Sequence, residues 1–126
     1  MKDILLVAIG GSLGAMSRYG LGLIIVRWLG TGFPWATLAI NVVGCLLIGM
    51  AMGGGAAPTG FLTREARLLG VIGFLGAFTT FSTFGYETIA LLQGGKAGLA
   101  LTYVLTSMVL GIGAVALGML ATRSLT

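Results

Sequence analysis

Hydroxyl and phenylalanine side chains are concentrated within an apolar stretch, in the run Thr79-Thr80-Phe81-Ser82-Thr83-Phe84. Hydroxyl groups donate and accept hydrogen bonds, and an aromatic ring carries a negative face and a positive edge. Because Phe81 and Phe84 are three residues apart, a helix places both rings on one side. Ring faces attract cations and ring edges can solvate a small anion, although core packing is the usual role of such a pair. The run is therefore a candidate ion site.

A second polar group, Thr37 and Asn41, lies in the preceding apolar stretch and is followed by Gly44. Residues four apart share one face of a helix. The Asn41 amide offers two donor hydrogens and an acceptor oxygen. Polar side chains at membrane depth are commonly functional, and the structural alternative is an interhelical hydrogen bond that contributes about 1 kcal/mol. We expect Thr37 and Gly44 to serve helix packing and Asn41 to face the ion.

Tyr103 and Ser107 form a further pair of hydroxyl side chains at helical spacing near the end of the chain. Arg18 and Glu87 are charged residues within apolar stretches. Each of these two either reaches the membrane interface, pairs with another charge or belongs to a functional path.

The chain is rich in hydrogen-bond donors and poor in acids, with three Asp and Glu residues, no histidine and one cysteine, Cys45. This composition argues against a carboxylate-lined path for divalent cations and against a transition-metal site. No nucleophile is paired with a base, which argues against an enzyme. Dehydrating an ion costs several kcal/mol, and each hydrogen bond to it recovers about 1.5–3 kcal/mol. A few donors could therefore hold a small anion or small polar solute transiently.

Membrane-spanning helices must position these side chains. Only 8% of the 126 residues are charged and 57% are hydrophobic, whereas a soluble domain carries roughly 25% charged residues. A helix needs about 20 apolar residues to cross the bilayer, and such stretches cover approximately residues 4–26, 33–52, 66–92 and 97–121. We predict an all-α integral membrane protein in which residues 1–126 form a single four-helix transmembrane domain.

The third stretch is a poor match to a continuous helix, because glycine and β-branched threonine both weaken helices. We predict that this helix is broken mid-membrane, near Gly76 to Thr79. Non-helical backbone at membrane depth is tolerated only inside protein or along a cavity, and its free carbonyls can hold a cation.

The spans are expected to pack closely and to meet a second subunit. Glycine pairs that let helix backbones approach are Gly10 and Gly14, Gly49 and Gly53, and Gly94 and Gly98. A thin bundle has little room for a wet path, so its polar groups are expected to face a partner in a homodimer or larger assembly. The positive charges flank the spans, with Lys2, Arg64, Arg67 and Arg123 on one side and Arg27 and Lys96 on the other. This weak bias leaves insertion in both orientations open, and the net charge of +4 is interpreted as a topology signal rather than a nucleic-acid site.

The sequence also closely resembles the Fluc family of microbial fluoride channels, along essentially its whole length. The matching segments are Gly10-Gly11-Ser12-Leu13-Gly14-Ala15-Met16-Ser17-Arg18-Tyr19, residues 37–44 and residues 73–84. The hydroxyl and phenylalanine run at residues 79–84 is the most specific of these. Ala36 and Ala77 stand where the family commonly has glycine, and Gly111 follows Ser107 by one helical turn. These departures bear on conductance rather than on the assignment.

The resemblance implies an antiparallel, dual-topology homodimer with two fluoride pores at the subunit interface. It implies that the ring edges of Phe81 and Phe84 contact fluoride and that Asn41 is the pore asparagine. The other pore-lining positions that it implies are Thr80, Ser82, Thr83, Tyr103 and Ser107. Arg18 would lie in an electropositive vestibule and Glu87 near a pore end. A structural Na⁺ would lie between the subunits, held by the backbone carbonyls of Gly76 and Thr79, and no organic cofactor is implied.

The implied function is passive, fluoride-selective export from the cytoplasm through the inner membrane of a bacterium, in contact with lipid and without nucleic acid. Two other functions are considered. A small multidrug antiporter is also a four-span dimer, but it requires a carboxylate in its first span, where this chain has Arg18 and no acid beyond Asp3. A non-transporting assembly subunit would leave the hydroxyl and phenylalanine run unexplained.

Overall fold

The computed structural model describes residues 1–54 and 62–123, and the secondary structure in these two ranges is entirely helical. The long helices are α1 (Lys2–Leu29), α2 (Trp35–Gly54) and α6 (Ala97–Arg123). A third span is assembled from α3 (Arg64–Ala66), the π-helix η1 (Arg67–Leu75), α4 (Gly76–Phe78) and α5 (Phe81–Gln93). All four stretches are long and apolar enough to cross a membrane. The predicted all-α, multi-pass membrane architecture is confirmed.

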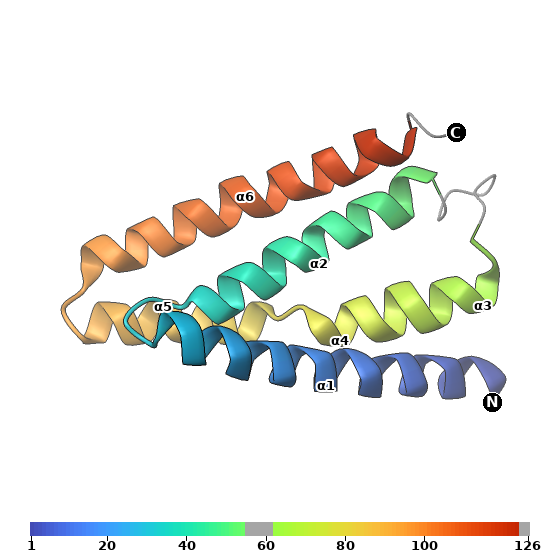
Figure 1. The fold of residues 1–126 in the computed structure, drawn as a ribbon, viewed down its shortest axis with the longest axis horizontal. Coiled ribbons are helices and arrows are strands. Elements are labelled where there is room, and N and C mark those ends of the chain that lie inside the picture. The colour runs from blue at the N-terminus through green and yellow to red at the C-terminus, as the bar shows by residue number, and fades with distance from the viewer. Residues whose placement is uncertain (55–61, 124–126) are drawn as a thin grey trace.

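The helices form two closely packed pairs (Figure 1). α2 packs mainly along α6, and α1 packs mainly along η1 and α4. α1 begins and α6 ends at the same end of the bundle (Figure 1), as an even number of spans requires. α2 also contacts α1 and the helices of the third span, so its side chains can reach the hydroxyl and phenylalanine run.

Glycines allow the backbones of paired helices to touch. A Cβ atom added to Gly10 or Gly14 of α1 would collide with a backbone carbonyl of η1, that of Leu69 or of Phe74. A Cβ atom at Gly49 of α2 would likewise collide with a carbonyl of α6. Gly98, in contrast, has open space within the described part of the protomer. The expected glycine packing thus applies to the pairs in α1 and α2 but not to Gly98.

The third span is interrupted at two threonines. α4 ends at Phe78, Thr79 and Thr80 have extended backbone (φ −82°, ψ 161° and φ −153°, ψ 117°), and α5 begins at Phe81. The sequence predicted a break near Gly76 to Thr79. Gly76 has helical backbone angles, and the non-helical residues begin only at Thr79. The Thr80 hydroxyl caps α5 by accepting from the Thr83 N–H at 3.2 Å.

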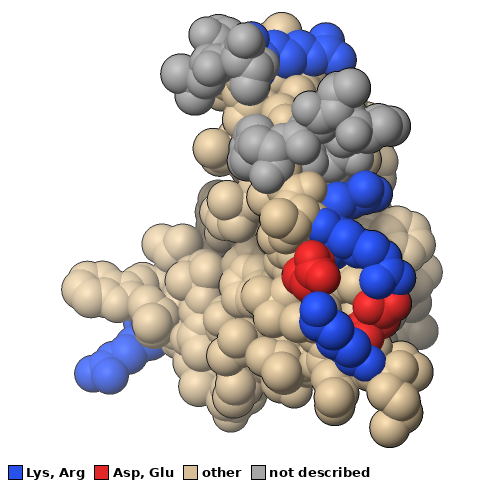
Figure 2. Space-filling model, turned by 90° about the vertical axis from the view of Figure 1, so that its right-hand side faces the viewer, with Lys and Arg blue, Asp and Glu red and all other residues tan. Residues whose placement is uncertain are grey.

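Charged side chains gather at the end of the bundle where α1 begins (Figure 2). Lys2 pairs with Glu65 at 3.1 Å, and Arg64 pairs with Asp3. These ion pairs join the start of α1 to α3 and are largely exposed, so solvent screening leaves them little effect on stability. Their main effect is to fix where the bundle meets the aqueous phase.

Candidate functional site

A cavity of about 390 Å³ lies beside the interruption of the third span. We call it the interruption cavity. The predicted site residues that line it are Asn41, Gly44, Gly76, Thr79, Thr80, Phe81, Phe84 and Ser107. The structure thus brings together side chains from α2, α5 and α6 that the sequence separates by up to 66 positions (107 − 41). Ser82, Thr83, Thr37, Tyr103, Glu87 and Arg18 lie outside this lining.

Asn41 holds the non-helical backbone of Thr80. Its Nδ2 donates to the Thr80 carbonyl at 2.9 Å, and its Oδ1 accepts from the Thr80 N–H at 2.8 Å. In a continuous helix that N–H would donate to the carbonyl of Gly76. The amide therefore replaces a missing helical partner, and Nδ2 retains a second hydrogen that can donate elsewhere. The sequence predicted Asn41 as a site residue but not these two bonds.

Three hydroxyls form a short chain at the start of α5. The Thr80 hydroxyl donates to Thr83 Oγ1 at 3.0 Å and lies 3.3 Å from Ser82 Oγ. Because the one hydroxyl hydrogen of Thr80 is used on Thr83, Ser82 is the donor to Thr80. The hydrogen of Thr83 is then free to donate to another group. Ser82 and Thr83 are both exposed in the protomer, so that group lies outside the protomer's own core.

The two phenylalanine rings differ in their surroundings. Their centroids are 5.6 Å apart and both line the interruption cavity. Phe84 is buried and packs against Tyr103, with centroids 5.1 Å apart. Phe81 is 78% exposed. The Phe81 ring is therefore exposed at the border of the interruption cavity.

Glu87 is held by two hydroxyl donors. Tyr103 Oη donates to one carboxylate oxygen at 2.7 Å, and Thr37 Oγ1 donates to the other at 2.9 Å. We call Thr37, Glu87 and Tyr103 the carboxylate cluster. The sequence named all three residues but did not predict that they contact one another. A carboxylate at membrane depth needs hydrogen-bond donors, and this need could have suggested the contact. Tyr103 is completely buried, with its hydroxyl committed to Glu87.

The Ser107 hydroxyl differs from those of Thr80 and Tyr103 in its hydrogen bonding. Its Oγ is buried and has no hydrogen-bond partner within the part of the chain that the structure describes. A buried hydroxyl without a partner is uncommon, because leaving it unsatisfied costs about 1–3 kcal/mol. Ser107 is part of the lining of the interruption cavity, but its Oγ has almost no accessible surface, so the side chain must rotate before the hydroxyl can donate to an occupant there.

Arg18 reaches the interruption from α1. Its Nη1 donates to the carbonyl of Thr79 at 3.2 Å. It also lines a cavity of about 360 Å³, the Arg18 cavity, together with Thr37, Thr80 and Thr83. The sequence left open whether Arg18 reaches the membrane interface, pairs with another charge or belongs to a functional path. In the structure its guanidinium contacts the non-helical backbone inside the protein.

The carbonyls of Gly76 and Thr79 are suitable ligands for a hard monovalent cation. The Gly76 carbonyl has lost its usual helical donor, since the Thr80 N–H donates to Asn41. The Thr79 carbonyl accepts from Arg18 and retains a second lone pair. Unwound backbone carbonyls of this kind coordinate Na⁺ in transporters. Two carbonyl oxygens do not complete a cation site, so a site built on Gly76 and Thr79 would need further ligands.

Comparison with known proteins places the chain in a family. A family model described as "CrcB-like protein, Camphor Resistance (CrcB)" matches residues 5–119. A Thermus thermophilus protein named fluoride-specific ion channel FluC is 51% identical over 89% of this chain and 88% of its own length. Proteins of the same name from Acidobacterium capsulatum and Nitrobacter winogradskyi are 51% identical over 90% of both chains, and 44% identical over 95% of this chain and 94% of theirs. The chain therefore belongs to the CrcB-like family, which confirms the resemblance seen in its sequence.

Proposed function

We propose that this protein is a fluoride-selective channel that allows passive export of fluoride from the cytoplasm. The observation that carries the proposal is the interruption cavity, whose lining combines the polar residues Asn41 and Ser107 with the Phe81 and Phe84 rings. The names of the relatives, fluoride-specific ion channels at 51% identity, support the same function.

The donor set of the cavity suits a small anion. Ser107 and the remaining Asn41 N–H can each donate to it, and each such hydrogen bond recovers about 1.5–3 kcal/mol of the dehydration cost. The positive edges of Phe81 and Phe84 add weaker attraction without a fixed charge. Electrostatic attraction falls with distance, so the smaller fluoride gains more from these donors than chloride does, but it also costs more to dehydrate. Selectivity for fluoride therefore requires donors held close enough that the gain exceeds this cost.

We further propose an antiparallel, dual-topology homodimer with two pores at the interface. Support comes from the exposed Thr83 hydroxyl, whose hydrogen has no acceptor in the described residues and cannot be satisfied by lipid, and from the exposed Phe81 ring two residues away. A second copy would cover these groups. Tyr103, buried behind Phe84, then supports the pore by orienting Glu87, which lies near a pore end.

A structural Na⁺ belongs to the same proposal. The Gly76 and Thr79 carbonyls of two antiparallel copies would supply the oxygens that one protomer lacks. When bound, the ion would provide a buried positive charge that cross-links the two interruptions. Asn41 and Arg18 would then orient these carbonyls through the bonds that they make with Thr80 and Thr79.

The proposed location is the inner membrane of a bacterium. A membrane potential that is negative inside drives an anion outward with about 2.3 kcal/mol per charge per 100 mV. Passive conduction would therefore remove fluoride from the cytoplasm without a coupled energy source.

Anion efflux from liposomes that contain the purified protein tests this role of the cavity. The vesicles are loaded with potassium fluoride, valinomycin is added, and a fluoride electrode follows release. Phe81→Ile should abolish efflux, whereas Ile89→Leu, an exposed residue of α5 outside the described cavities, should leave it unchanged. Full fluoride efflux through folded Phe81→Ile protein would contradict a role for the ring.

A further inference from the structure

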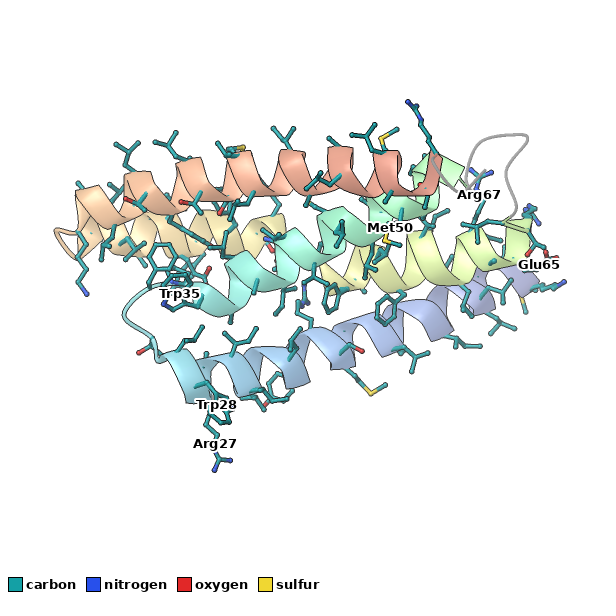
Figure 3. The ribbon with its side chains drawn as sticks, turned by 45° about the horizontal axis from the view of Figure 1, so that its top comes forward. Arg27, Trp28, Trp35, Met50, Glu65 and Arg67 are labelled. Carbon is teal, nitrogen blue, oxygen red and sulfur yellow. The ribbon has the colours of Figure 1, made fainter. Side chains whose placement is uncertain are left out.

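The carboxylate cluster borders a further cavity, at the opposite end of the bundle from the ion pairs of α1 and α3. A cavity of about 270 Å³, the end cavity, lies between the α1–α2 connection and the α5–α6 connection. Its lining includes Phe33, Pro34 and Trp35 from one side and Glu87, Leu91 and Lys96 from the other. Trp35 marks this end of the bundle in Figure 3.

The end cavity adjoins the site already described. Glu87 lines it and is also the acceptor in the carboxylate cluster. Phe33 lines it and packs edge-on against Tyr103, with ring centroids 5.6 Å apart. The end cavity shares Val26 and Ala36 with the Arg18 cavity, which in turn shares Thr80 with the interruption cavity. The three cavities thus follow one another through common walls.

This arrangement poses an electrostatic problem for an anion. Glu87 is a carboxylate at the inner wall of the end cavity, and a negative charge repels an approaching anion. Its two hydroxyl donors spread that charge but do not cancel it. A nearby cation would offset the repulsion and raise the local anion concentration.

Lys96 is the cationic residue in the lining of the end cavity. We propose that Lys96 is a steering residue that draws small anions into this mouth past Glu87, an inference that rests on the proposed channel function. Arg27 lies at the same end of the bundle, but its side chain points away from the helices (Figure 3) and does not line the cavity. Arg18 lies further in and is bonded to Thr79.

The experiment compares Lys96→Gln and Lys96→Glu with the matched control Arg27→Gln. Fluoride efflux is measured in liposomes at about 0.01 M ionic strength, where the Debye length is about 30 Å, and at about 1 M, where it is about 3 Å. At low ionic strength Lys96→Gln should lower the initial rate about threefold and Lys96→Glu further, because a single charge supplies only part of the roughly 10-fold or greater rate increase that a whole charged cleft can give. Both rates should return to that of the unmodified protein at high ionic strength. Arg27→Gln should change neither.

The outcomes separate this inference from the channel function itself. Absence of fluoride efflux in the unmodified protein would overturn the channel proposal before any variant is compared. If the unmodified protein conducts and Lys96→Gln matches it at low ionic strength, the steering role is wrong. Equal loss in Lys96→Gln and Arg27→Gln would also overturn it, because a general surface charge would then account for the effect. Lys96→Arg, which keeps the charge, should match the unmodified protein at low ionic strength, and the full rate of Lys96→Gln at high ionic strength would show that this variant is folded.

Discussion

The side-chain amide of Asn41 forms two hydrogen bonds with the backbone of Thr80, at 2.9 and 2.8 Å, across the interruption of the third span. It satisfies polar groups that a continuous helix would have satisfied itself, in a region where water is scarce. The same residue lines the cavity that we assign to the ion. Stability of the interruption and polarity of the cavity therefore depend on one side chain.

Asn41→Asp should lower both stability and fluoride efflux. The aspartate keeps an acceptor for the Thr80 N–H but loses the donor to the Thr80 carbonyl and adds an anion-repelling charge. An unsatisfied buried group costs about 1–3 kcal/mol. Thermal unfolding in detergent and efflux from liposomes measure the two effects. Unchanged stability and efflux would show that the pairing with Thr80 is not maintained in the working protein.

Tyr103→Phe should destabilise the protein by about 1–2 kcal/mol, because Glu87 loses one of its two hydroxyl donors while the ring packing is kept. The control is Tyr86→Phe, since Tyr86 is exposed on the same span as Glu87 and lies outside the carboxylate cluster. Thermal unfolding of both variants checks the difference. Equal midpoints would mean that the Tyr103 hydroxyl contributes nothing to holding Glu87.

Ser107→Ala should separate function from stability. The Ser107 hydroxyl has no partner in the described residues, so its removal should change the free energy of unfolding by less than about 0.5 kcal/mol or be stabilising. Fluoride efflux should nevertheless fall, because the cavity loses a donor. Ser17→Ala, at an exposed position away from the cavities, serves as the control. A clear loss of stability with full efflux would contradict the assigned role.

Gly10→Ala should weaken the contact between α1 and η1. The added methyl would collide with the Leu69 carbonyl, and overpacking of this kind costs about 1–3 kcal/mol. Gly20→Ala, in the same helix, has nothing within 4 Å of the new atom and should be neutral or stabilising through helix propensity. The unfolding midpoints of the two variants provide the comparison. A larger loss from the Gly20 variant would contradict the packing described for α1.

The sequence predicts the helical class and the identity of most site residues, because each depends on residue type within an apolar stretch. Asn41 and the hydroxyl and phenylalanine run are conspicuous at membrane depth, where polar groups are costly. The four spans follow from length and hydropathy alone.

The partners of these residues could not be predicted in the same way. The bonds from Asn41 to Thr80 and from Arg18 to Thr79 join residues 39 and 61 positions apart. They depend on the relative depth and rotation of different helices, which composition does not fix. Thr37 was expected to serve helix packing, and its hydrogen bond to Glu87 joins α2 to α5, but the sequence could not identify Glu87 as its partner. Gly98 lies four residues after Gly94, but no described residue packs against it. The spacing of two glycines does not show which face of a helix another helix covers.

The central claim, selective passive conduction of fluoride, is tested most directly by comparing fluoride and chloride efflux from liposomes that contain the unmodified protein. Valinomycin carries the compensating potassium, and ion-selective electrodes follow each anion under matched gradients. We predict rapid fluoride efflux on addition of valinomycin and chloride efflux no faster than from protein-free vesicles. Equal efflux of the two anions, or no fluoride efflux from protein verified as folded, would contradict the account.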